Sequence, residues 1–349
     1  MADSENDKIE ASNEVTTNKT EENNSADETP QATSDVVANC EKASYKPNVI
    51  PGEKLASIED VVNSDPECYE LDLNHHRIDK LENLEPLTQL ERLLLRWNLI
   101  KKIDNLEKLT KLVEIEFYDN QITKLENLDA LVNLEILDVS FNRLTKIENL
   151  ENLKKLEKLF LVGNKITHIE NIGMLTNLTM LELGDNKIKT IENLDTLVNL
   201  RQLFLGKNKI SKIENLDKLV NLEILSLQAN RIVKIENLDK LTNLTELYLS
   251  ENGIEIIENL SNNKQLDTLD LAKNRLKSID NIEELAQLEE LWLNDNNIEN
   301  WKTIENIKHN KSLKTIYLEY CPVSKDPMYR RKLKDIAPWL EKIDATLCR

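Results

Sequence analysis

Residues 143–164 read RLTKIENLENLKKLEKLFLVGN, and this 22-residue unit recurs along most of the chain. Asparagine returns at the last position of the unit, at a constant interval. The series comprises Asn98, Asn120, Asn142, Asn164, Asn186, Asn208, Asn230, Asn252, Asn274 and Asn296. A second series with the same interval runs from Asn83 to Asn281. A fixed period of this length indicates repeated units that stack side by side into a solenoid.

Two segments with different hydrophobic periods make up each unit. Leu159 and Leu161 flank Phe160, and such alternation is typical of a short strand with one buried face. The preceding segment has an apolar residue at every third position, as tight helical turns do: Ile147, Leu150, Leu153 and Leu156. We therefore predict an α/β repeat solenoid. Parallel strands would form a curved sheet on its concave face, and short 3-10 or helical returns would form its convex face.

The register changes once, near the C-terminus. The step from Asn281 to the next equivalent residue, Asn306, is three positions longer than the others, and Cys321 then replaces Asn at the last strand exit. The segment that follows has apolar residues at helix-like spacing: Leu333, Ile336, Trp339, Leu340 and Ile343. We predict about 12 repeats over residues 55–321 and a helical cap over residues 322–349 that covers the open end of the stack.

The N-terminal segment has a different composition from the repeats. Residues 1–50 contain 11 Asp and Glu against 4 Lys and Arg, with many Ser, Thr and Asn and few large apolar residues. Such a segment cannot bury enough apolar surface to offset its ordering entropy. We therefore predict a disordered acidic tail over residues 1–54.

Charge and composition argue against several classes of partner and site. The net charge of −18 repels nucleic-acid phosphates and anionic membranes, so we expect neither as a partner. The sequence shows no secretory signal and no 18-residue apolar run, which predicts an intracellular, soluble protein. The four cysteines are far apart and lack metal-ligand spacing, which favours reduced thiols. No phosphate-binding loop or nucleophile–base set is visible, so we expect neither a cofactor nor an enzyme.

One residue in each predicted strand lies between two buried leucines and should project from the concave face. In successive repeats, this position is occupied by Asp72, Leu94, Glu116, Asp138, Phe160, Glu182, Phe204, Ser226, Tyr248, Asp270, Trp292 and, after the insertion, Tyr317. Exposed rings flanked by carboxylates are typical of a protein-binding surface, since rings bury large areas and carboxylates select basic groups. The alternative is that the rings only pack on one another along the sheet.

The sequence resembles the 22-residue leucine-rich-repeat class and, more closely, the protein phosphatase-1 regulatory subunit 7 family. The resemblance covers about residue 66 to the end of the chain. It rests on the repeated IENL register, on the concave row and on the terminal YLEYCPVSKDPMYRRKLKDIAPWLEKIDAT, which resembles the cap of that family.

This resemblance implies a leucine-rich-repeat solenoid that acts as a regulatory subunit. Its concave face would bind the catalytic subunit of protein phosphatase-1 and control its activity, maturation or localisation in nucleus and cytoplasm, with a role in mitosis. The matching partner-binding residues are Asp138, Phe160, Glu182, Phe204, Asp270, Glu290, Trp292 and Tyr317. The sequence leaves open whether a third regulatory subunit joins, and we expect a monomer outside the complex. The alternative is a leucine-rich-repeat scaffold of a ribonucleoprotein or axonemal assembly.

Overall fold

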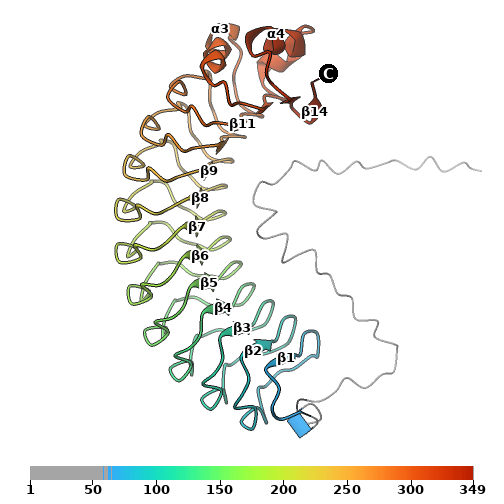
Figure 1. Cartoon of the computed structure of the whole chain (residues 1–349), viewed down its shortest axis with the longest axis vertical. Coiled ribbons are helices and arrows are strands. Elements are labelled where there is room, and N and C mark those ends of the chain that lie inside the picture. Colours follow the sequence, from blue (N-terminus) through green and yellow to red (C-terminus); the bar gives the residue numbers. More distant parts are fainter. Residues whose placement is uncertain (1–57, 59–61, 64, 349) are drawn as a thin grey trace, which may run out of the picture. The chain divides into compact units, whose positions relative to one another are not determined.

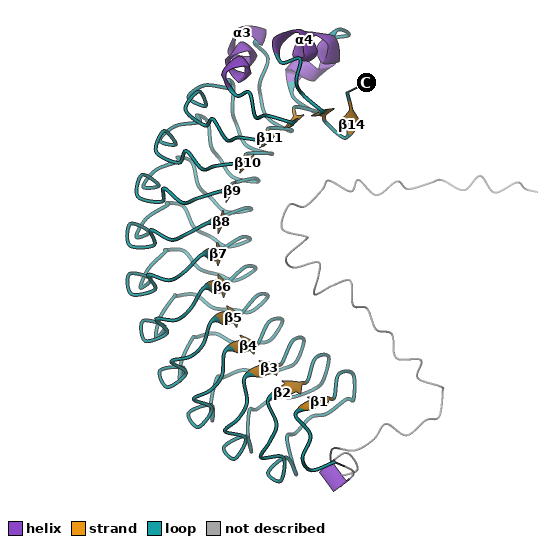
Figure 2. Cartoon of the chain, viewed as in Figure 1, coloured by secondary structure: helices purple, strands orange, loops and turns teal. Residues whose placement is uncertain are grey.

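A computed structural model of the chain describes residues 58, 62–63 and 65–348. Within this part, strands β1 to β14 form one sheet in sequence order (Figure 1). The parallel strands are β1 Glu70–Asp72, β2 Arg92–Leu94, β3 Glu114–Glu116, β4 Ile136–Asp138, β5 Lys158–Phe160, β6 Met180–Glu182, β7 Gln202–Phe204, β8 Ile224–Ser226, β9 Glu246–Tyr248, β10 Thr268–Asp270, β11 Glu290–Trp292 and β12 Thr315–Tyr317. They line the inner side of the curved stack, and the returns lie outside, as predicted (Figure 2).

Every one of these strands pairs with its neighbour without a shift in register. Leu159 of β5 lies beside Leu181 of β6, which lies beside Leu203 of β7. Equivalent side chains of consecutive repeats therefore stack in columns that run the length of the sheet. Most leucines and isoleucines of the repeats form one continuous buried core between the sheet and the returns. The predicted leucine-rich-repeat solenoid with a concave parallel sheet is confirmed.

The buried asparagines hold the bend after each strand. Asn186 Nδ2 donates to the carbonyl oxygens of Leu161, Leu183 and Gly184 at 2.9, 3.1 and 3.0 Å. Its Oδ1 accepts a hydrogen bond from the Ile166 amide at 2.9 Å. One side chain thus satisfies backbone groups of its own repeat and of the preceding one, which explains its strict recurrence.

The returns are mostly pairs of tight turns rather than helices. In the unit quoted above, the amides of Leu153 and Leu156 each donate to the carbonyl three residues earlier at 3.0 Å. Asn149 precedes these turns in the left-handed region, at φ 58°. Helices occur in the return that carries the three-residue insertion, as α3 Trp301–Ile304 and the 3-10 helix η1 Glu305–His309. The extra residues therefore lengthen one return and leave the strand register intact.

The C-terminal cap contains the 3-10 helix η2 Pro322–Lys325 and the helix α4 Tyr329–Ile336. The helix that the apolar spacing predicts beyond Ile336 is wrong, because the chain forms strands there. After Pro338, which cannot continue a helix, β13 Lys342–Ile343 pairs with β12 and β14 Thr346–Leu347 folds back on β13. The cap therefore closes the stack with a helix on the core and a hairpin on the sheet edge.

The predicted acidic tail, residues 1–54, lies outside the described residues. Ile58 and Val62, which precede the first strand, pack against the leucine core. No helix in residues 58, 62–63 and 65–348 combines the length and apolar character needed to cross a membrane.

Candidate protein-binding surface

The inner column of the sheet consists of the third residue of each strand from β1 to β12. Strand pairing places Asp138, Phe160, Glu182 and Phe204 in consecutive positions of this column. Asp270, Trp292 and Tyr317 form a second run at its C-terminal end. Ser226 and Tyr248 lie between the two runs.

Glu290 lies beside the column rather than in it. It is the first residue of β11, and its Oε2 accepts a hydrogen bond from Trp292 Nε1 at 3.1 Å. The ring of Trp292 in turn meets the Tyr317 ring edge-on, with centroids 5.6 Å apart. The structure therefore brings the eight predicted residues into two groups, one on β4–β7 and one on β10–β12.

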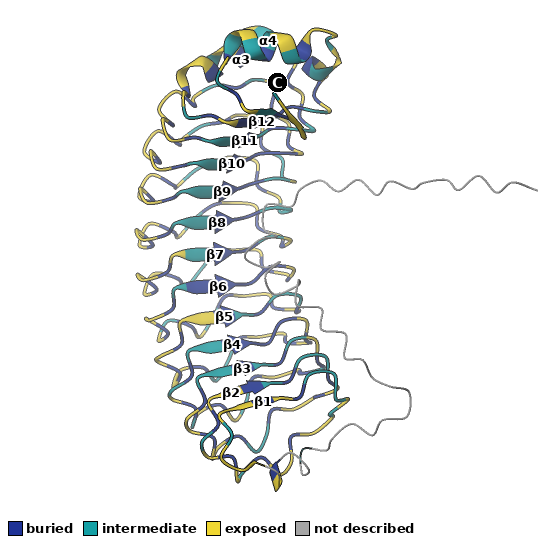
Figure 3. Cartoon of the chain, turned by 45° about the vertical axis from the view of Figure 1, so that its right-hand side comes forward, coloured by how far each residue is buried: buried dark blue, intermediate teal, exposed yellow. Residues whose placement is uncertain are grey.

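The rings of the inner column are less exposed than the alternation pattern suggests. Phe160 and Trp292 are half-buried, but Phe204 is only 4% exposed, which makes the expectation of an exposed ring there wrong. Phe204 does not belong to the leucine core, which contains its neighbours Leu203 and Leu205. Side chains of adjacent in-register strands cover one another on the inner face, because strands are only about 4.8 Å apart. Figure 3 shows β6, the strand before β7, as a buried segment of this face.

Three carboxyl groups of the column are also buried. Asp138, Glu182 and Asp270 are 8, 6 and 3% exposed. Each accepts a hydrogen bond from the backbone amide two residues ahead, at 2.8, 2.8 and 2.9 Å respectively. Loss of hydration raises all three pKa values, that of Glu182 to about 8 and that of Asp270 to about 6.

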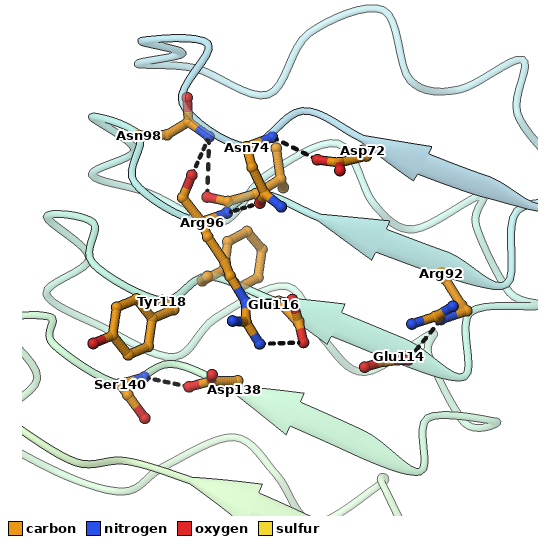
Figure 4. A network of polar contacts seen from close by, with 12 residues as sticks. Asp72, Asn74, Arg92, Arg96, Asn98, Glu114, Glu116, Tyr118, Asp138 and Ser140 are labelled. Carbon is orange, nitrogen blue, oxygen red and sulfur yellow. Dashed lines mark hydrogen bonds and ion pairs between the residues drawn. The ribbon is translucent and has the colours of Figure 1, made fainter. Parts of the chain in front are cut away.

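Glu116 of the same column forms an ion pair, whereas within residues 65–348 the cations nearest Asp138 and Asp270 act on them only through their charge, without an ion pair. Arg96, which follows β2, donates to both Glu116 oxygens at 2.5 and 2.7 Å (Figure 4). The Arg96 guanidinium also lies 5.8 Å from the centre of the Tyr118 ring. Burial still raises the pKa of Glu116, against the opposing effect of Arg96. Acidic side chains at equivalent positions therefore differ in how strongly cations of the chain compensate them, from the Glu116 ion pair to Glu182, whose pKa no cation lowers.

A second aromatic group, at the bends of the first repeats, was not predicted from the sequence. His75 stacks on Trp97 at a centroid distance of 4.3 Å, Trp97 meets Tyr118 at 5.5 Å, and Tyr118 meets Phe141 at 4.9 Å. His75, Trp97 and Phe141 have positive φ, which is unusual for large side chains. The residue before each buried Asn is the signal that could have revealed Trp97 and Phe141, since both occupy that position of the repeat.

The chemistry of this surface favours binding. Within residues 58, 62–63 and 65–348, no three His, Cys, Asp or Glu side chains are arranged to hold a metal ion. The buried carboxyls of the column are separated by rings or by whole strands, and each accepts a hydrogen bond from a backbone amide. Rings and carboxyls in this arrangement suit a partner that presents apolar and basic groups.

Comparison with known proteins supports a leucine-rich-repeat fold for this chain. The repeat family described as "Leucine Rich repeats (2 copies)" matches residues 132–174, 176–218, 220–262 and 264–309, which together make up half of the chain. The crystal structure of an internalin (inlF) from Listeria monocytogenes superposes with a TM-score of 0.66 at 25% identity, covering 84% of this chain and 90% of that one.

Curated relatives share shorter stretches. "Protein phosphatase 1 regulatory subunit 7" of Xenopus tropicalis is 49% identical over 66 residues, and that of Homo sapiens is 50% identical over 50 residues. These stretches cover 19% and 14% of this chain and the same shares of the relatives. The aligned stretches thus span about a fifth or less of each relative's length. By its repeats, its strand register and its fold, the chain belongs to the leucine-rich-repeat family.

Proposed function

We propose that this chain is a non-enzymatic regulatory subunit that binds the catalytic subunit of protein phosphatase-1 across the inner column. The observation that carries the proposal is the pair of ring-and-carboxyl groups, Asp138 to Phe204 and Asp270 to Tyr317, on one face of the sheet. The name of the relatives at about 50% identity supplies the partner. We further propose that binding controls the activity, maturation or localisation of the phosphatase in nucleus and cytoplasm, including in mitosis.

The geometry supports a protein partner of this kind in two ways. The column runs the length of the sheet, about 50 Å at the usual strand spacing, which is long enough to contact a globular domain. Half-buried rings such as Phe160 and Trp292 can bury further area at little entropic cost, because their neighbours already restrict them.

The test is a binding titration of the recombinant phosphatase-1 catalytic subunit with the full chain and with Phe160→Ala/Trp292→Ala. Anchor rings contribute about 2 kcal/mol each, so the double variant should bind at least about 100-fold more weakly. The matched control is Val198→Ala/Val220→Ala, which truncates two side chains of the returns that are 45 and 46% exposed. Equal affinity of the ring variant and the wild type would contradict the proposed surface. Capture of RNA without the phosphatase would favour a scaffold of another assembly.

A further inference from the structure

Glu182 has no neutralising partner within the described part of the chain. Its Oε1 accepts a hydrogen bond from the Gly184 amide at 2.8 Å, and within residues 65–348 no hydrogen bond or ion pair reaches its Oε2. The side chain is nevertheless buried, at 6% exposure. A buried carboxyl with one backbone donor is poorly compensated for the water it loses, and it favours the neutral form.

Neighbouring residues determine the position of the Glu182 carboxyl. In the column it lies between Phe160 of β5 and Phe204 of β7, and a methyl group on Gly184 would come within 2.7 Å of Oε1. Glycine at this position therefore lets the carboxyl fold back on its own strand exit. The flanking rings offer aromatic surfaces to a cation.

The charged groups near Glu182 do not neutralise its carboxyl. Asp138, two strands away, acts on Glu182 as a like charge. Lys158 at the start of β5 and Asp185 and Lys207 in the bends after β6 and β7 are exposed, and Gln202 at the start of β7 is neutral. Besides burial, the groups that shift the pKa of Glu182 are the Gly184 amide and Asp138, and neither Lys158 nor Lys207 is among them.

We propose that the partner places a lysine or arginine side chain against Glu182 and that this contact releases the carboxyl proton to solvent. The inference rests on the proposed function and deepens it by naming the partner's chemistry at this position. The O–H bond of the Glu182 carboxyl breaks, the proton passes to buffer, and the carboxylate pairs with the ammonium or guanidinium; no other bond changes. Glu116, which already has Arg96, needs no such group.

The burial of Glu182 raises its pKa to about 8, so at pH 7 the free chain carries a proton there that an ion pair would displace. Binding should then release about one proton at pH 7, and the affinity should rise by up to about tenfold per pH unit between pH 6 and 8. Asp270 is a natural comparison, because its pKa of about 6 leaves it mostly ionised at pH 7.

The experiment is calorimetric titration of the phosphatase-1 catalytic subunit into the full chain at pH 7, in buffers of different ionisation enthalpy. Wild type and the control Asp195→Asn, which changes an exposed carboxyl of a return, should release about one proton per complex, and Glu182→Gln should release almost none. Equal proton release by wild type and Glu182→Gln would overturn this inference and leave the proposed function standing. Failure of the wild type to bind at any pH would overturn both.

A second readout needs no partner. The carbon-13 shift of the Glu182 side-chain carboxyl, identified by its absence in Glu182→Gln, should titrate well above the ordinary range for glutamate in the free chain. Titration within the ordinary range, near pH 4, would also overturn the inference.

Discussion

Arg96 and Glu116 form a two-point ion pair across adjacent repeats, with N–O distances of 2.5 and 2.7 Å and side chains that are only 16 and 13% exposed. The pair joins the bend after β2 to the inner column on β3 (Figure 4). One repeat here supplies the charge that a neighbouring repeat needs.

Removal of this cation should destabilise the fold. Arg96→Ala leaves a largely buried carboxylate without its partner, and we expect a loss of about 2 kcal/mol in the free energy of unfolding. Arg201→Ala removes the cation of an exposed pair with Glu223 and should cost less than about 0.5 kcal/mol. Urea denaturation followed by circular dichroism measures both. Equal losses would show that burial does not set the strength of these pairs.

The two asparagine series should differ in their contribution to stability. Asn186→Ala abolishes donors to three carbonyls and an acceptor for one amide, all within the buried bend, and should cost about 3 kcal/mol. Within residues 65–348, Asn193 makes one side-chain hydrogen bond, to the Ile169 carbonyl at 2.6 Å, and it has a φ of 59°. Asn193→Ala should cost about half as much, and Asn193→Gly less still, because glycine accepts this φ. The order of the three denaturation midpoints tests this ranking of the two series. A larger loss of stability in Asn193→Ala than in Asn186→Ala would contradict it.

The columns of the sheet could be predicted from the sequence, because a period of 22 with strand alternation leaves only one way to stack the leucines. The exposed fraction of each side chain within a column could not be predicted from the sequence. Phe204 and Glu182 are covered by side chains of adjacent repeats, and an in-and-out pattern along one strand carries no information about that. The C-terminal hairpin was missed because Ile343 has the same apolar character whether it caps a helix or extends the sheet.

Gly163 should tolerate a side chain poorly. Its φ is 66°, and an added methyl group would lie 2.8 Å from Cδ1 of Phe141, whose ring covers it. Gly163→Ala should lose about 1–2 kcal/mol and displace the Phe141 ring. Gly206→Ala is the control, because its nearest atoms lie at 3.5 Å. Thermal unfolding and the chemical shifts of the Phe141 ring report both effects. Unchanged chemical shifts of the Phe141 ring in Gly163→Ala would contradict the contact between this ring and Gly163.

The stability of the free chain should depend on pH through Glu182. The folded chain holds a proton there up to a pKa of about 8, whereas the unfolded chain loses it near pH 4.3. The unfolded state therefore binds fewer protons between these values, and stability falls as pH rises. Glu182→Gln lacks this loss and should gain stability relative to wild type between pH 6 and 8.5. Denaturation midpoints that move in parallel for the two proteins would show that Glu182 titrates normally.

Photocrosslinking tests most directly whether the inner column holds the partner. A benzophenone amino acid is placed at Phe160, in the column, or at Val198, in a return, and each chain is irradiated with the phosphatase-1 catalytic subunit. Crosslinks from position 160 and none from position 198 are predicted. Crosslinks from position 198 with none from position 160 would place the partner on the outer side and contradict the account.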